Sequence, residues 1–208
     1  VGVGLERLVF HPLRNSPHTH HMIAAVGAMF FFQALAQAIW GADFRRMDTP
    51  ITGELRILGA EISAQRIVII VTAVIVLALL ALFIKRSIHG QTIEAIEQDR
   101  VGASLVGINP SMVSMLTLGL SALLATIAAG LVAPINLLSP TMGDALNLKV
   151  FAIIILGGLG SLPGAIVGGF ALAIAETMTA TYISSAVGEA VAFIVLVAVL
   201  AIKPNGLF

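Results

Sequence analysis

The stretch that decides the fold is VFAIIILGGLGSLPGAIVGG, residues 150–169. It is apolar enough to enter a bilayer, yet it contains six glycines and one proline, which interrupt helices. Because lipid offers no hydrogen bonds to free backbone groups, a broken helix at membrane depth must be shielded by protein or line a water-filled path. Discontinuous helices of this kind often mark binding sites in transporters. The stretch therefore predicts a protein that moves a solute across a membrane.

The composition around this stretch is that of a membrane protein. Hydrophobic residues make up 58% of the 208 residues and charged residues only 11%, whereas a soluble domain is about 25% charged. A helix needs about 20 apolar residues to cross a bilayer. The sequence thus predicts an all-α fold, a polytopic transmembrane helix bundle. Runs without Asp, Glu, Lys or Arg cover residues 22–42, 67–84, 101–143, 150–175 and 190–202.

Two expected helices flank the glycine-rich stretch. Residues 149–159 are too few for a full span, so we expect a half-span, followed by a helix over residues 164–182. A turn at residues 160–163 would make them a discontinuous, glycine-rich helix pair. With that reversal, the polar segment 85–110 and the C-terminus lie on the same face of the membrane. The full spans expected elsewhere are residues 22–40, 67–84, 111–133 and 190–202.

Several classes of function are excluded by what the sequence lacks. The net charge is zero and no basic run exceeds two residues, so nothing favours nucleic-acid binding. There is no cysteine, and the histidines of residues 18–21 have no distant carboxylate partner at a metal-site spacing. We interpret them as a solvated loop. The glycines before Ser161 and Leu162 are not followed by the lysine of a phosphate-binding loop.

Glu176 is the one acidic residue within an otherwise apolar stretch, and two interpretations stay open for it. An ionisable residue inside a membrane is a functional candidate by default, and a carboxylate that faced the path would suit a substrate ammonium. Alternatively it lies near an interface, or bonds locally to the hydroxyl of Thr177 or Thr179. An integral-membrane enzyme would need a cluster of His or Asp at this depth, and the sequence contains none.

The polar segment 85–110 is the largest between two expected spans. Within it, the spacing of apolar residues over residues 92–105 predicts one short amphipathic helix, with Thr92 as its N-cap. Its acidic side chains are better interpreted as a docking surface for a soluble partner than as catalytic acids, which would need a pocket. The apolar positions of this predicted helix are Ile93, Ile96, Val101 and Leu105.

Five motifs in a fixed order give the chain a family resemblance. They are ERLVFHPLR, IEAIEQDRVGASLVGIN, LVAPINLLSPTMG, the glycine-rich stretch itself, and the ending KPNGLF. With them the chain resembles, over nearly all of its length, the LivH-like permeases of bacterial ABC importers for branched-chain amino acids. Members of that family are usually longer, which implies that residues 1–208 are a single transmembrane permease domain without its N-terminal spans.

The resemblance implies a mechanism and a set of partners. Such a permease pairs with a second permease subunit, two cytoplasmic ATPase subunits and a periplasmic substrate-binding protein, in the bacterial inner membrane. ATP is used by the partner subunits, and this chain binds no cofactor and is not an enzyme. Segment 85–110 would face the cytoplasm and couple to the ATPases, an orientation that charge alone leaves open. The coupling residues implied are Glu94, Ala95, Asp99, Gly107 and Ile108.

The translocation path and the substrate are less narrowly defined by sequence. Leucine, isoleucine and valine, or urea and short amides, all suit a permease of this type. The alternative function is a self-sufficient secondary transporter or channel for a small polar solute, which would usually need several embedded carboxylates. The residues expected at the path or the helix break are Gly157, Gly158, Gly160, Pro163, Gly164, Gly168 and Glu176.

Overall fold

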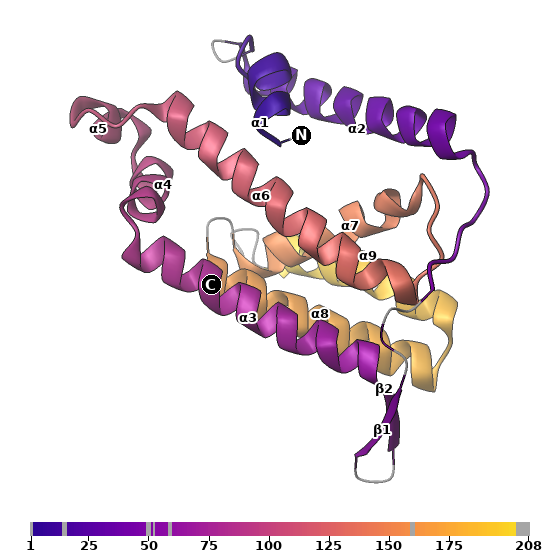
Figure 1. The fold of residues 1–208 in the computed structure, drawn as a ribbon. Helices are drawn as coiled ribbons and strands as arrows, with labels where there is room; N and C mark the ends of the chain where they lie inside the picture. The colour runs from indigo at the N-terminus through magenta and orange to yellow at the C-terminus, as the bar shows by residue number, and fades with distance from the viewer. Residues whose placement is uncertain are drawn as a thin grey trace. The chain divides into compact units, whose positions relative to one another are not determined.

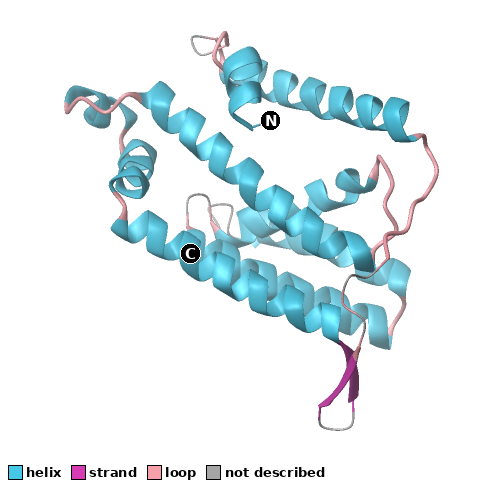
Figure 2. Cartoon of the chain, in the orientation of Figure 1, coloured by secondary structure: helices cyan, strands magenta, loops and turns pink. Residues whose placement is uncertain are grey.

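The structure is a computed structural model, and it describes residues 2–13, 16–48, 51, 53–57, 60–158 and 161–202. The chain divides into two compact units, Val1–Pro140 and Thr141–Phe208. Helices dominate the described residues of both units, and a short two-stranded hairpin lies in the first (Figure 1, Figure 2).

The first unit opens with two short helical turns and a long helix. The turns are α1 (Gly2–Leu5) and the π-helical η1 (Glu6–Phe10), and the long helix is α2 (His18–Trp40). A Cβ atom on Gly2 would lie 2.6 Å from the carbonyl oxygen of Leu118, so only glycine allows this close contact between the turns and helix α6 (Pro110–Val132).

The start of α2 corrects the prediction of a solvated histidine loop. The helix begins at His18, four residues before the expected span, so residues 18–21 form its first turn. Pro17 precedes that turn with φ −54° and ψ 153°; proline cannot donate the backbone hydrogen bond that earlier helical continuation would need.

A two-stranded hairpin joins α2 to the next span. Strands β1 (Glu54–Ile57) and β2 (Ala60–Ser63) pair antiparallel, with Glu54 opposite Ser63 and Ile57 opposite Ala60. Figure 2 shows the hairpin extending beyond the end of the helix that follows it, α3 (Ala64–Arg86). The strands of the hairpin therefore lie outside the candidate span Ala64–Arg86.

The end of α3 turns sharply into α4 (Ile88–Gln98). A Cβ on Gly90 would lie 2.5 Å from the carbonyl oxygens of Ile84 and Phe83, so the corner requires a glycine. Ser87 caps α4, since its hydroxyl accepts a hydrogen bond from the Gly90 amide at 2.9 Å. The prediction of Thr92 as the cap was wrong: its hydroxyl donates to the His89 carbonyl inside the helix.

The remaining helices of the first unit are α5 (Arg100–Leu105), α6 (Pro110–Val132) and the 3-10 turn η2 (Ala133–Ile135). Helix α6 starts at a proline, and the Asn109 side chain accepts from the Ser111 amide at 3.0 Å. The loop after η2 is tied to the loop after α2 by two backbone hydrogen bonds between Arg45 and Leu138, at 2.9 and 3.0 Å.

The second unit holds α7 (Met142–Gly157), α8 (Leu162–Tyr182) and α9 (Ser185–Ile202). Its core brings together Ala152, Leu172 and Ala192, one residue from each helix. Helix α7 starts seven residues before the predicted half-span, and α9 starts five residues before the predicted last span. Both predictions placed polar residues in loops that the structure instead assigns to first helical turns.

Four helices of the described residues are long and apolar enough to cross a membrane, which confirms the predicted all-α, multi-pass fold. The apolar windows of the first three are not buried within the chain, as expected for surfaces that face lipid or other helices. Helix α9, Ser185–Ile202, covers the predicted last span, residues 190–202, and its apolar part Ser185–Val199 is not counted among these four. The four spans are Thr19–Trp40, Ala64–Arg86, Pro110–Ile135 and Leu162–Tyr182.

Candidate functional site

The glycine-rich stretch forms the junction between α7 and α8. Helix α7 ends at Gly157, and Gly158 follows with φ 84°, a conformation that favours glycine. Helix α8 begins at Leu162 with Pro163 in its first turn, and the Ser161 hydroxyl accepts from the Gly164 amide at 3.0 Å. The remaining predicted residue of the break, Gly160, lies outside the described residues.

Glycines on both sides of this junction let the two backbones touch. A Cβ on Gly157 would lie 2.5 Å from the Gly164 carbonyl oxygen, and one on Gly164 would overlap the Gly157 carbonyl oxygen. A Cβ on Gly168 would lie 3.2 Å from the Ile153 carbonyl oxygen. Three of the glycines predicted at the break therefore serve close helix packing, as small residues do between membrane helices.

The contacts along the two helices establish that α8 runs back along α7. Gly157 meets Gly164 at the junction, and Ile153 meets Gly168 one turn further on. Lys149 meets Glu176 further still from the junction. In these contacts the residue numbers decrease along α7 as they increase along α8. The two helices therefore run antiparallel and form a helical hairpin.

Glu176 forms an ion pair across this hairpin. Lys149 Nζ donates to Glu176 Oε1, and the two side chains are 30% and 24% exposed. The hydroxyls of Thr177 and Thr179, expected as local partners of Glu176, instead donate to the carbonyl oxygens of Ala173 and Ala175 in their own helix. Pairing compensates a carboxylate that would otherwise stand alone in a helix able to span the membrane.

Lys149 is the functional candidate that sequence reasoning missed. In the sequence it is the first residue of the expected half-span, residues 149–159. Part of the signal is in the sequence, since Lys149 and Glu176 are the charged residues directly before and directly after the charge-free run 150–175. Joining them requires the register of the α7–α8 hairpin, which the sequence pattern alone does not supply.

The coupling segment differs from its prediction, because residues 92–105 form two helices rather than one. Asp99 leaves the helical conformation with φ −150° and ends α4. Its carboxylate accepts from the amides of Val101 and Gly102, each at 2.9 Å, and so caps α5. An acidic N-cap also complements the positive end of the helix dipole.

The predicted coupling residues Gly107 and Ile108 terminate α5. Gly107 has φ 89°, and its amide bonds to the Ser104 carbonyl at 3.1 Å. The Ile108 amide bonds to the Ala103 carbonyl, also at 3.1 Å. This pair of bonds is a Schellman motif, which stops the helix and redirects the chain toward α6.

The surface of α4 and α5 is both acidic and apolar. Glu94 and Asp99 are exposed, whereas Ala95 is half-buried. Val101 and Leu105 are 69% and 83% exposed, whereas Ile93 and Ile96 are half-buried, so the four apolar positions do not form the single face of one amphipathic helix. The kink at Asp99 is the physical reason, because it breaks the helical period between the two pairs.

No group of three or more metal-ligating side chains gathers among the described residues. The two assemblies of interest remain the α7–α8 hairpin with its ion pair and the α4–α5 segment.

The chain is similar in sequence to known proteins of one family. The model of the family described as branched-chain amino acid transport system / permease component matches residues 7–200. The chain is 31% identical, over 99% of its length, to the Escherichia coli (strain K12) high-affinity branched-chain amino acid transport system permease protein LivH. It is 32% identical, over 99% of its length, to the corresponding protein BraD of Pseudomonas aeruginosa. In both cases it covers 69% of the relative.

A more distant relative extends the comparison to an archaeon. The probable branched-chain amino acid transport permease protein LivH of Methanocaldococcus jannaschii is 29% identical over 68% of this chain and 48% of its own length. No solved structure matches the chain. The resemblance inferred from the five motifs is confirmed, and this chain belongs to the family of permease components of branched-chain amino acid transport systems.

Proposed function

We propose that this chain translocates branched-chain or related amino acids as the membrane-spanning permease subunit of an ABC importer. The observation that carries the proposal is its 31–32% identity, over 99% of its length, to proteins named as permeases of branched-chain amino acid transport systems. The four helices able to span a membrane support it. Under this proposal the chain carries out translocation, and ATP hydrolysis is catalysed by other subunits.

The partners follow from this role. We propose a second permease subunit, two cytoplasmic ATPase subunits that use the ATP, and a periplasmic binding protein that delivers substrate to the inner membrane. The chain itself holds no cofactor under this proposal. Specificity between leucine, isoleucine and valine on one hand and urea or amides on the other is shared with the binding protein.

The α4–α5 segment is proposed as the surface on which an ATPase subunit docks. Its support is the exposure of Val101 and Leu105, which a soluble partner would cover. Glu94 adds negative charge on α4, so a basic rim on the ATPase would complement it. The Schellman motif at Gly107 holds the segment to α6 and would carry motion into that span.

The α7–α8 hairpin is proposed as part of the translocation path or of its immediate support. Irregular backbone at membrane depth needs protein or water beside it. The rigid glycine contact and the Lys149–Glu176 pair make the hairpin a body that can move as a unit.

The second candidate, a self-sufficient secondary transporter or channel, has less support. Glu176 is the one acidic residue in the four described candidate spans, and it is already paired with Lys149. A proton- or sodium-coupled cycle would need free carboxylates within the spans.

Two experiments test the proposal. The full-length parent protein is purified from its native membrane, and we expect a second permease and two ATPase subunits to come with it. ATP-dependent uptake of labelled leucine is then measured after reconstitution with the binding protein. Isolation of the protein alone with uptake that needs no ATP would contradict the importer and favour the second candidate.

Charge reversal of Glu94 tests the docking surface. Glu94→Lys should weaken co-purification of the ATPase, because an exposed acidic residue would face basic groups of the partner. The matched control is Gln91→Lys, an exposed position on the same helix that carries no charge to reverse. Equal recovery of the ATPase with both variants would remove this assignment.

A further inference from the structure

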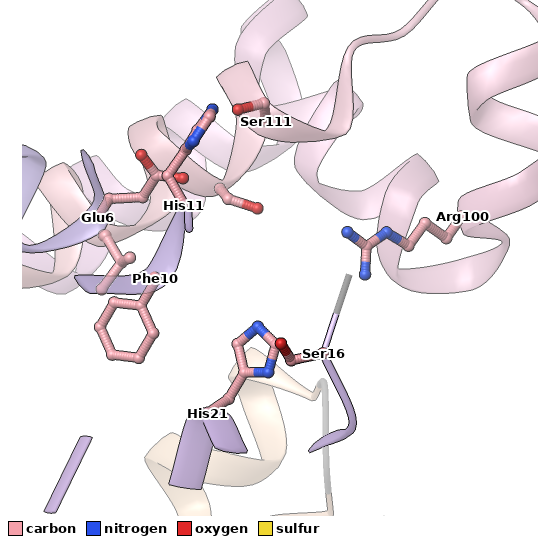
Figure 3. Close-up of a pocket in the computed structure, with 9 residues that line it drawn as sticks. Glu6, Phe10, His11, Ser16, His21, Arg100 and Ser111 are labelled. Atoms are coloured by element: carbon pink, nitrogen blue, oxygen red, sulfur yellow. The ribbon is translucent and has the colours of Figure 1, made fainter. Parts of the chain in front are cut away.

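The described residues of the first unit line two kinds of cavity. One is polar and lies between η1, the start of α2, α5 and the start of α6 (Figure 3). Charged groups of both signs, Glu6 and Arg100, line it, so its charge favours neither an anion nor a cation. The other is an apolar groove between α3 and α6, which has charge of one sign and at one end only.

The α3–α6 groove is long enough to follow most of a bilayer. One part of it reaches Ile69 and Leu131, near strand β2, and the other reaches Arg86, next to α4. From Ile69 to Arg86, helix α3 rises about 25 Å, against about 30 Å for the hydrocarbon core of a membrane. The groove is continuous, because its two parts share Val76, Leu80, Leu124 and Ile127.

The groove has the form of a wedge. Its part near β2 has a volume of about 320 Å³, and its part next to α4 has a volume of about 550 Å³. The narrow end is held by Gln65, whose side-chain amide donates to the Leu131 carbonyl at 3.5 Å. Figure 1 shows α3 and α6 diverging from that end toward α4. A helix keeps a width of about 10–12 Å along its whole length, so flexible chains fit a wedge better than a helix does.

Arg86 gives the wide end of the groove its positive charge. It is the last residue of α3 and of the candidate span Ala64–Arg86, so its guanidinium lies where lipid headgroups begin. Ser87 also lines this end; its oxygen accepts from the Gly90 amide, and its hydroxyl hydrogen can donate to a ligand. Among the described residues that line the groove, none is acidic.

These features select a ligand with an anionic head and flexible apolar chains. A phosphate ester suits a guanidinium beside a hydroxyl. Three lining side chains next to the wide end, Leu79, Leu82 and Leu123, are 60%, 54% and 55% exposed, so acyl chains in the groove would cover apolar surface. A free phosphate would leave that surface uncovered, and an uncharged hydrocarbon would leave Arg86 without a counterion.

We propose that the α3–α6 groove binds an acidic phospholipid. Its phosphate bonds to Arg86 and Ser87, and its acyl chains follow the groove toward the narrow end. The lipid fills the wedge and so holds α3 and α6 at a fixed angle. Because Ser87 also caps α4, the lipid head lies at the joint between a span and the α4–α5 segment. The site goes beyond the proposed function and does not rest on it.

Lipid binding to the full-length protein, purified in mild detergent with whatever subunits accompany it, tests the site. The probe is dioleoylphosphatidylglycerol, and the comparison is dioleoylphosphatidylcholine, which has the same chains but no net charge. Native mass spectrometry counts the lipids that remain bound. We expect the glycerol lipid to bind about fivefold more tightly, the factor that one basic residue contributes at a membrane surface. Inorganic phosphate at millimolar concentration should not displace it.

Two pairs of matched variants locate the head and the chains of the lipid. Arg86→Gln should weaken phosphatidylglycerol binding about fivefold and abolish the preference over phosphatidylcholine. Its control, Lys85→Gln, removes the same charge from an exposed neighbour that does not line the groove, and it should change neither quantity. Leu123→Trp fills the wide part and should weaken both lipids, whereas Leu35→Trp, an exposed position on α2, should weaken neither. If Leu123→Trp fails to fold, the first pair still decides the question.

Four results would overturn the proposal. Equal weakening by Arg86→Gln and Lys85→Gln would show a diffuse attraction to the membrane surface. Equal binding of the two lipids to the unmodified protein would show that no acidic head is recognised. Displacement by inorganic phosphate would assign Arg86 to a free anion. A photoactivatable label on Leu123→Cys that reacts with a protein helix, and not with lipid, would assign the groove to that helix.

Failure of the importer proposal is measured separately, by ATP-dependent uptake in the complete complex. Uptake that persists while phosphatidylglycerol binding fails these tests would reject the lipid site and keep the importer. Selective lipid binding without ATP-dependent uptake would keep the site and reject the importer.

Discussion

The α7–α8 hairpin and the α4–α5 segment both interrupt a helix, but by different means. Between α7 and α8 the backbones themselves touch, through Gly157 and Gly164, and an ion pair closes the far part of the contact. Between α4 and α5 the interruption is one exposed side chain, Asp99, which bonds to two amides of the next helix.

The difference follows from the surroundings of each break. In an apolar stretch, backbone groups need protein around them, so the break is made with glycines that permit close packing. In an exposed segment, water forms hydrogen bonds with the backbone groups that the cap leaves free, so a single carboxylate is enough to cap the helix. The hairpin is therefore expected to be rigid, and the α4–α5 segment adjustable.

The largest expected effect comes from adding a methyl group inside the hairpin. Gly164→Ala places a Cβ against the Gly157 carbonyl, where backbone on both sides cannot yield easily. We expect loss of stability at or above the upper end of the about 1–3 kcal/mol typical of overpacking. Thermal unfolding and leucine uptake of the reconstituted complex measure it.

Gly169→Ala is the control for that prediction. Its Cβ would lie 3.8 Å from the Ile153 side chain, an ordinary contact. It should be close to neutral in the same assays. Equal behaviour of the two variants would mean that the glycine contact does not hold α7 to α8.

The next effect comes from leaving one charge of the ion pair alone. Lys149→Met should destabilise the hairpin by about 2 kcal/mol, below the 3–5 kcal/mol of fully buried pairs, because both side chains are partly exposed. The double variant Lys149→Met/Glu176→Gln should recover most of the loss, because no lone charge remains.

If the single variant Lys149→Met is as stable as the unmodified protein, the pair contributes nothing to the stability of the hairpin.

Uptake by Glu176→Gln tells whether the pair also serves transport. Unchanged uptake by a stably assembled Glu176→Gln variant would count against a part for Glu176 in the path.

A smaller effect is expected at the end of α5. Gly107→Ala forces a Cβ into a backbone with φ 89°, at a cost of about 1–2 kcal/mol. We expect a lower melting temperature of the permease and weaker recovery of the ATPase. Gly143→Ala, in α7 with open space around its Cβ, is the control and should not lower either quantity.

The smallest effect separates the cap from the charge at Asp99. Asp99→Asn keeps an acceptor for the Val101 and Gly102 amides, whereas Asp99→Ala removes it, at about 1 kcal/mol. Thermal unfolding should therefore be lowered by the alanine and hardly changed by the asparagine. Equally weakened ATPase recovery with both variants would indicate that the charge, and not the cap, contacts the partner.

Much of the fold was predictable because the bilayer imposes a simple rule on sequence. Charge-free runs located the helices α2, α3, α6 and α8 to within a few residues. The starts of α2 and α7 were missed, because polar residues such as His18 and Asp144 lie in first helical turns, where hydropathy resembles a loop. Helix ends are set by caps, which hydropathy does not register.

The candidate sites were predictable only in part. The glycine-rich break and Glu176 were evident as exceptions within apolar sequence. The break at Asp99 was missed because the apolar spacing across it still fits one helix, although Asp99 is itself a favoured cap residue. The groove between α3 and α6 was missed because its lining comes from two spans and depends on the angle between them.

By itself, the sequence determined that this protein is a multi-pass, all-α permease of a recognisable family, because apolar length and ordered motifs are local properties. The tertiary structure decided which glycine meets which backbone and that Lys149 is the partner of Glu176. It also decided that Arg86 lies at the wide end of an apolar groove between α3 and α6. Those facts depend on helix register and on contacts between residues far apart in the chain, which no local pattern encodes.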